Sequence, residues 1–286
     1  MNGYAGIFQH NFAGRTIAIT GGAGALGSVV AEALAWAGAN IAVLDRSAEA
    51  GERLEQKIDR SDAGGRVLFI QTDVLQRDSL AAAEARIRAE LGPVDALVNT
   101  AGGNHPAATT GAYAAGGAPA PSFFDLTEAG MRAVFDLNFL GTFLPCQAFG
   151  LGMVERGEGA ILNITSIVAV RPLTRIPAYA AAKAAVASFT QWLAVYMAQN
   201  HSPRIRVNAL APGFFMSEQS RFLALDSETG EVSPRARSVI AHTPVGRYGE
   251  PEELLGAVLW LLSPASTFVT GSVICVDGGF TAYSGV

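Results

Sequence analysis

Short apolar runs alternate along the chain with longer stretches of helical periodicity. The runs are five to seven residues long and rich in Val, Ile and Leu, which is typical of parallel strands buried on both faces. We predict strands at residues 15–20, 40–45, 66–72, 95–99, 160–165, 205–210 and 272–276. The helical stretches lie at residues 26–37, 48–60, 79–91, 129–155, 178–200 and 252–262. This alternation predicts an α/β fold, a doubly wound parallel sheet of seven strands with helices on both faces.

Two long connections interrupt the alternation, at residues 102–122 and 213–248. Both follow the carboxyl end of a predicted parallel strand, which is where ligands bind in open α/β sheets. Long connections in a compact domain are usually functional, so we predict that 213–248 is a substrate lid. No break in composition divides the 286 residues. We therefore predict one domain, residues 1–286.

Composition and charge narrow the class of protein. Half of the residues are apolar and only 16% are charged, which favours a folded chain with a large core. The net charge of −5 gives no reason to expect nucleic acid or an anionic membrane as partner. The apolar stretch 254–262 is too short to span a bilayer, and the first residues lack the pattern of a signal peptide. We expect a cytoplasmic protein.

The two cysteines, Cys146 and Cys275, lie far apart in apolar surroundings. Two thiols cannot form a disulfide framework, and a zinc site needs more ligands. We predict that both are small buried hydrophobic residues. No metal is expected.

A glycine-rich turn follows the first predicted strand. Gly22, Gly24 and Gly27 satisfy the spacing G-x-G-x-x-G, and a helix N-terminus behind such a turn offers N–H donors to a pyrophosphate. Asp45 ends the second strand 18 residues beyond Gly27, as expected for a carboxylate that binds the adenosine ribose. The turn, its flanking strand and helix, and Asp45 together predict a Rossmann-type dinucleotide site.

The same carboxylate bears on the choice of cofactor. Asp45 accepts hydrogen bonds from ribose hydroxyls, whereas a 2′-phosphate at ~4 Å is repelled by ~4 kcal/mol at an intermediate dielectric. NAD is favoured on this ground. The neighbouring Arg46 could instead pair with a phosphate, which leaves NADP open.

Tyr179 and Lys183 stand four residues apart at the start of a predicted helix, so their side chains share one face. A phenol with an ordinary pKa near 10 is a poor base at neutral pH. A nearby ammonium stabilises the phenolate, and lowering its pKa by ~3 units requires ~4 kcal/mol. Ser166 follows the fifth strand and adds a hydroxyl at the same sheet edge.

These residues appear in the order found in the short-chain dehydrogenases/reductases, which the chain resembles over nearly its whole length. The resemblance implies that Tyr179 is the acid/base and that Lys183 holds the nicotinamide ribose and lowers the tyrosine pKa. It also implies that Ser166 orients the carbonyl and that Asn138 positions a proton-relay water. One departure is Ala25, where the family commonly has glycine.

The predicted cofactor contacts extend this set along the edge of the sheet. In this fold, the loops after the third and fourth strands come near the adenine and ribose, although each could also be ordinary turn chemistry. The full set is Gly21, Gly22, Gly24, Ala25, Leu26, Gly27, Asp45, Arg46, Asp73, Val74, Asn99, Ala101, Gly102, Tyr179, Lys183, Pro212, Gly213 and Phe215.

A narrower resemblance concerns the substrate. The stretches 101–109, 135–142, 176–179, 211–215, 218–219, 242–244 and 280–286 are similar to the branch of the family that acts on sugar acids such as D-mannonate and D-fructuronate. A sugar acid needs cations or donors for its carboxylate. The candidates are Asn104, His105, Arg171, Arg175, Gln219 and Arg221. Any one arginine could equally be a surface residue, and His105 could cap a turn.

The alternatives to a sugar acid are gluconate, another polyol or a hydroxy-ketone. A nucleotide-sensing protein without catalysis is a rival of another class, but it would lack part of the tetrad that is complete here. The resemblance also implies paired long helices at a symmetric interface. We therefore predict a homotetramer, or at least a dimer.

Overall fold

A computed structural model describes residues 12–61, 63–111, 121–216, 224 and 230–285. Seven parallel strands form one sheet in the order β3-β2-β1-β4-β5-β6-β7. The strands are β1 (Thr16–Thr20), β2 (Asn40–Asp45), β3 (Val67–Gln71), β4 (Val94–Asn99), β5 (Gly159–Ile164), β6 (Ile205–Pro212) and β7 (Val273–Val276). The predicted fold class is confirmed, and every strand lies within two residues of its predicted position.

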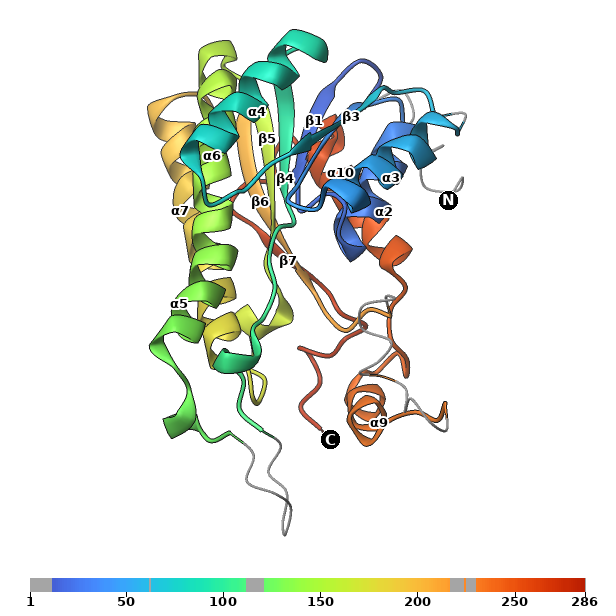
Figure 1. Ribbon diagram of the computed structural model, residues 1–286, viewed down its shortest axis with the longest axis vertical. Coiled ribbons are helices and arrows are strands. Elements are labelled where there is room, and N and C mark those ends of the chain that lie inside the picture. Colours follow the sequence, from blue (N-terminus) through green and yellow to red (C-terminus); the bar gives the residue numbers. More distant parts are fainter. Residues whose placement is uncertain (1–11, 62, 112–120, 217–223, 225–229, 286) are drawn as a thin grey trace.

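Helices cover both faces of the sheet (Figure 1). They are α2 (Ala25–Trp36), α3 (Ala48–Asp59), α4 (Arg77–Glu90), α5 (Glu128–Phe135), α6 (Gly141–Arg156), α7 (Pro177–Asn200), α9 (Pro234–His242) and α10 (Leu255–Leu262). One buried apolar cluster joins the sheet to α2, α3 and α10. A second joins its other face to α4, α6 and α7. The two clusters make the layered architecture expected of a doubly wound sheet.

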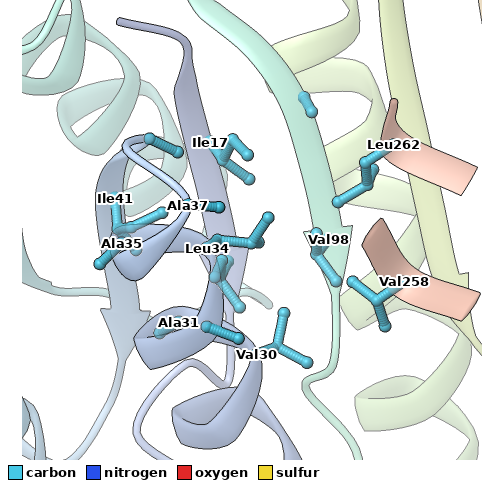
Figure 2. Packing of buried hydrophobic residues seen from close by; sticks show 14 of the residues in the cluster. Ile17, Val30, Ala31, Leu34, Ala35, Ala37, Ile41, Val98, Val258 and Leu262 are labelled. Carbon is cyan, nitrogen blue, oxygen red and sulfur yellow. The ribbon is translucent and has the colours of Figure 1, made fainter. Parts of the chain in front are cut away.

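The first cluster shows why α2 and α10 pack side by side (Figure 2). Leu34 of α2 and Val258 of α10 are almost fully buried against Val98 of β4. Burying each such side chain stabilises the fold by about 1.5–3 kcal/mol. This packing fixes α2 beneath β1, so that its N-terminus opens at the carboxyl edge of the sheet.

The predicted helix 129–155 is confirmed as one helical span, Glu128–Arg156, which contains α5 and α6. Between α5 and α6 the backbone forms a π-helix, Asp136–Leu140. Periodicity did not reveal it because the mixture of polar and apolar residues in this turn is also typical of an α-helix. Glu128–Arg156 is long and apolar enough to cross a membrane, but half of its most apolar 18-residue window is buried and α6 packs on β4 and β5. A core helix accounts for its composition.

Helix α9 lies within the segment predicted as a lid and was not predicted as a helix. Its start carries ordinary signals, since Ser233 caps the helix by accepting a hydrogen bond from Ala236 N (3.1 Å) and Pro234 is the first residue. The helix packs on Phe214 and Tyr248 in a small satellite cluster. Residues 217–223 and 225–229 of the predicted lid lie outside the described residues.

The two cysteines behave differently. Cys146 is buried as predicted, and burial raises the pKa of its thiol to about 12. Cys275 is exposed, so the prediction that both are buried was wrong. It lies on β7, the edge strand of the sheet, where a single chain leaves one side uncovered.

Candidate active site

A cavity of about 490 Å³ opens at the carboxyl edge of the sheet, between β1 and β4, where the order in which successive strands are added to the sheet reverses. This is the topological switch point at which open α/β sheets bind ligands. Its lining comes from the carboxyl ends of six strands and the loops after them, the first turns of α2 and α7, and the π-helix. The lining residues are Gly21, Gly24, Ala25, Leu26, Gly27, Leu44, Asp45, Arg46, Thr72, Val74, Thr100, Ala101, Gly102, Gly103, Leu137, Ile164, Thr165, Ser166, Tyr179, Lys183, Pro212, Gly213 and Phe215.

The glycine turn forms the floor of this cavity. Gly21 has a φ of +60°, and a Cβ there would lie 2.7 Å from the Cα of Ala101. A Cβ on Gly27 would lie 2.3 Å from the carbonyl oxygen of Gly21, closer than real Cβ atoms come. The N-cap Gly24 supplies no side-chain cap to α2. The first N–H groups of the helix are therefore available to a pyrophosphate, and Ala25 is accommodated as the first helical residue.

Asp45 lines the far end of the cavity from the tip of β2. One carboxylate oxygen accepts a hydrogen bond from Ala23 N (3.1 Å) and the other from Ser47 N (3.0 Å). These bonds fix the carboxylate while leaving lone pairs for ribose hydroxyls. Arg46 is exposed beside it.

Three predicted cofactor residues do not line the cavity. Gly22 lies beneath the turn, where a Cβ would lie 2.8 Å from the carbonyl oxygen of Ile19. Asp73 closes its own turn by accepting from Leu75 N (2.9 Å). Asn99 is buried and donates to Asn163 Oδ1 (2.9 Å). All three residues stabilise the carboxyl edge of the sheet without lining the cavity.

Sequence reasoning missed seven lining residues: Leu44, Thr72, Thr100, Gly103, Leu137, Ile164 and Thr165. Most of them are sequence neighbours of residues that were predicted, at the same strand ends. Proximity along the chain was thus the signal that could have found them.

Ser166, Tyr179 and Lys183 meet at the opposite end of the cavity. Burial raises the pKa of the Tyr179 phenol, and its hydrogen bond with Ser166 partly offsets that rise. The Lys183 ammonium lies 5.7 Å from the centre of the Tyr179 ring and donates to the carbonyl oxygen of Ile164 (2.8 Å). Burial lowers the pKa of Lys183 to about 8. The predicted spacing thus brings Tyr179 and Lys183 together on α7, but the expected lowering of the Tyr179 pKa was wrong, because burial outweighs the hydrogen bond with Ser166.

Asn138 is fully buried in the π-helix, and its side chain forms hydrogen bonds with the backbone around it. Its Nδ2 donates to the carbonyl oxygens of Gly103 (2.7 Å) and Val134 (2.8 Å), and its Oδ1 accepts from Gly103 N (3.2 Å). A Cβ on Gly102 would lie 2.6 Å from this Oδ1 and 3.1 Å from Lys183 Nζ. Asn138 therefore holds the loop after β4 against the catalytic pair. The relay water stays a prediction.

A second cavity of about 750 Å³ lies beside Arg175. Of the predicted substrate residues, Asn104 and Arg175 line it. His105 instead caps a short helical turn by accepting from Ala107 N (3.1 Å), and Arg171 donates to the carbonyl oxygen of Tyr283 (2.6 Å). Gln219 and Arg221 lie outside the described residues. Within the described part of the chain, no group of His, Cys, Asp and Glu side chains could hold a metal ion.

The family follows from comparison with known proteins. The family model described as enoyl-(acyl carrier protein) reductase matches residues 21–281. An uncharacterised oxidoreductase of Bacillus subtilis is 45% identical over 97% of this chain and 99% of its own. The 5-keto-D-gluconate 5-reductase of Escherichia coli is 34% identical over 94% of this chain and 96% of its own. The chain belongs to the short-chain dehydrogenases/reductases.

Solved structures agree with this assignment. A candidate D-mannonate oxidoreductase from Haemophilus influenzae, solved with bound NAD, superimposes with a TM-score of 0.91 at 43% identity. The match covers 98% of this chain and 100% of that one. An L-sorbose reductase from Gluconobacter frateurii, solved with NADPH and L-sorbose, gives a TM-score of 0.83 at 27% identity, covering 96% of this chain and 98% of its own. The protein is an NAD(P)-dependent oxidoreductase.

The residues present fit that cofactor. Three features form a cradle for a dinucleotide: the close approach of backbone at Gly21 and Gly27, the uncapped N-terminus of α2 and the fixed carboxylate of Asp45. The cradle leads along the cavity to Tyr179 and Lys183, where the nicotinamide end would lie.

Proposed function

We propose that the protein interconverts a secondary alcohol and a ketone on a six-carbon sugar acid, D-mannonate and D-fructuronate. The meeting of Ser166, Tyr179 and Lys183 at the end of a dinucleotide cavity supports the reaction type. Two matches support the sugar acid: the Haemophilus protein described as a candidate D-mannonate oxidoreductase, and the 5-keto-D-gluconate reductase.

The chemistry divides between cofactor and protein. When bound, the nicotinamide supplies or accepts a hydride. The Ser166 hydroxyl donates to the carbonyl oxygen of the substrate and orients it. The Tyr179 phenol gives its proton to that oxygen in reduction and takes it back in oxidation. Because burial raises the pKa of Tyr179, the phenol holds its proton at neutral pH, as reduction requires. Lys183 stabilises the phenolate that remains.

The preferred cofactor in this proposal is NAD. Both oxygens of Asp45 are fixed by backbone N–H groups, so the carboxylate cannot easily turn away from a 2′-phosphate. Such a phosphate at ~4 Å costs ~4 kcal/mol at an intermediate dielectric. Arg46 is exposed beside the cavity and is the residue through which NADP would bind.

A second candidate is the same reaction on a neutral or differently substituted polyol. The galactitol 2-dehydrogenase of Cereibacter sphaeroides is 34% identical over 94% of this chain and 96% of its own. A catalytically inactive nucleotide sensor is disfavoured because Asn138, Ser166, Tyr179 and Lys183 are all present and the last three line one cavity.

Two further proposals concern assembly and closure. Phe189, Trp192 and Tyr196 stack along α7, and Trp192 is 58% exposed. Such an apolar helix face favours the paired helices of a homotetramer. We also propose that 213–248 closes over the substrate, because its described part places Phe214 on the second cavity and Phe215 on the first.

The proposal is tested by measuring NADH and NADPH oxidation against D-fructuronate, 5-keto-D-gluconate, L-sorbose and an aliphatic hydroxy-ketone. We expect the highest kcat/KM with NADH and D-fructuronate. A higher kcat/KM with L-sorbose or the hydroxy-ketone would favour the second candidate, and no turnover with any of them would overturn the assignment.

A further inference from the structure

The second cavity continues the active site. Neighbouring residues on the same two segments line the two cavities: Gly103 and Asn104 after β4, and Phe215 and Phe214 after β6. The residues just before α7 line the second cavity, whereas Tyr179 on its first turn lines the first. A substrate whose reacting carbon lies at Tyr179 therefore extends from one cavity into the other.

The charge of the second cavity is one-sided. Arg175, Arg235 and His242 line it, and none of its described lining residues is acidic. Neither arginine lies within ion-pairing distance of a carboxylate in the described part of the chain. Two guanidinium groups beside one cavity, with no carboxylate partner among the described residues, favour an anionic ligand, and a planar carboxylate matches their geometry.

Arg175 is held in an unusual backbone conformation. With a φ of +76°, Arg175 is the only non-glycine residue with a positive φ among the residues that the structure describes. Such a conformation costs energy and is concentrated at ligand sites. Two hydrogen bonds hold it there: Thr110 N donates to its carbonyl oxygen (2.9 Å), and its Nε donates to the carbonyl oxygen of Thr110 (3.1 Å). The Nη atoms make no hydrogen bond to another described residue, so they remain available to a ligand.

Arg235 occupies a position that helix stability does not explain. It is the second residue of α9, where a cation opposes the helix dipole. Its guanidinium carbon lies 5.8 Å from the centre of the Phe214 ring, which places the charge over an aromatic wall of the cavity. At the other end of α9, His242 bonds the carbonyl oxygen of Ser238 through Nδ1 (2.7 Å), which leaves Nε2 for the cavity.

We propose that Arg235, together with Arg175 and His242, binds the substrate carboxylate and selects sugar acids over neutral sugars. In a six-carbon sugar acid the carboxylate can lie several bonds from the reacting ketone, which suits a subsite beside Tyr179. Sequence reasoning missed Arg235 and His242 because α9 was not predicted. The inference rests on the proposed function and adds the residues that recognise the acid.

The first test compares acid and neutral substrates. Arg235→Gln should raise KM for D-fructuronate or 5-keto-D-gluconate by about 10- to 100-fold, because it removes a charge-assisted hydrogen bond. It should leave kcat, and KM for L-sorbose, within a few-fold, and Arg235→Lys should recover part of the loss. Arg237→Gln is the matched control, since Arg237 lies on the same helix and donates to the carbonyl oxygen of Val232. Equal losses for acid and neutral substrates would overturn the proposal.

The second test does not depend on turnover. Tartrate, a small hydroxy-dicarboxylate, is titrated into the enzyme saturated with NAD and followed by calorimetry. We expect Arg235→Gln to weaken binding by about tenfold or more, while Arg237→Gln binds as wild type does. Unchanged affinity in Arg235→Gln would overturn the subsite. If wild type reduces no keto-sugar acid but tartrate binding still depends on Arg235, the proposed function fails and the anion subsite stands.

Discussion

The Lys183 ammonium lies 5.7 Å from the centre of the Tyr179 ring, and its hydrogen bond goes to the carbonyl oxygen of Ile164 (2.8 Å). We propose that the lysine acts on the phenol through its charge, from a buried position on the same helix face. Ser166 supplies the hydrogen bond that lowers the phenol pKa directly. Proton transfer thus depends on two different groups whose effects can be separated by substitution.

We predict that Tyr179→Phe removes nearly all turnover and leaves NADH affinity close to wild type. Loss of the proton donor should reduce kcat by ~10⁴-fold, at the top of the range for general acid–base catalysis. The ring that lines the cavity is retained. Steady-state kinetics and fluorescence titration of NADH measure the two effects. Activity within a few-fold of wild type would contradict the assignment of Tyr179.

The buried lysine should make stability depend on pH. Burial lowers the pKa of Lys183 from 10.5 to about 8 in the folded chain, so the unfolded chain binds more protons between those values. The cost of a buried charge is fully present below pH 8 and is relieved as pH rises toward 10.5.

Wild type should therefore gain about 3 kcal/mol in free energy of unfolding relative to Lys183→Met across that window. Urea denaturation of both proteins from pH 7 to pH 10.5 measures the difference. A difference that stays constant with pH would show that the lysine titrates normally.

Asp45→Ser should shift cofactor preference toward NADPH. The substitution removes the charge that repels a 2′-phosphate, and the hydroxyl can still accept from Ala23 N. We expect weaker NADH binding and an increase of 10-fold or more in kcat/KM with NADPH, since ~4 kcal/mol of repulsion is removed. Arg46→Ala serves as the comparison and should keep the preference for NADH. A wild-type enzyme that prefers NADPH would contradict this interpretation.

The stacked aromatic face of α7 should be an interface between copies of the chain. Trp192→Glu places a charge on that face and should dissociate the tetramer, whereas Trp192→Phe keeps an apolar ring and should preserve it. Sedimentation velocity distinguishes the species. A wild-type protein that sediments as a monomer at working concentration would overturn the prediction.

The strands were predictable because most of them are buried on both faces and all of them are largely apolar. Once the sheet was predicted to be parallel, the residues at the carboxyl ends could be placed together, and Asp45, Ser166 and Tyr179 do line one cavity. The parallel topology, more than any single motif, made the location of the site predictable from the sequence.

The remaining features depend on tertiary contacts that no local pattern reports. The π-helix that holds Asn138 has the sequence Asp-Leu-Asn-Phe-Leu, which does not distinguish it from an ordinary α-helical turn. Helix α9 has Ser233 and Pro234 as signals of a helix start, but the residues that flank it in the sequence are typical of a polar loop. Whether Cys275 is buried depends on what covers the edge strand, and whether Arg235 faces a cavity depends on how α9 packs against Phe214.

The central claim, hydride transfer to a keto-sugar acid, is tested most directly by following the transferred hydrogen. The enzyme is incubated with D-fructuronate and NADH deuterated at the transferring position, and the product is analysed by mass spectrometry and NMR. We predict D-mannonate carrying one deuterium on the former ketone carbon, and none with Tyr179→Phe. Unchanged D-fructuronate, or deuterium in no product, with the wild-type enzyme would contradict the account.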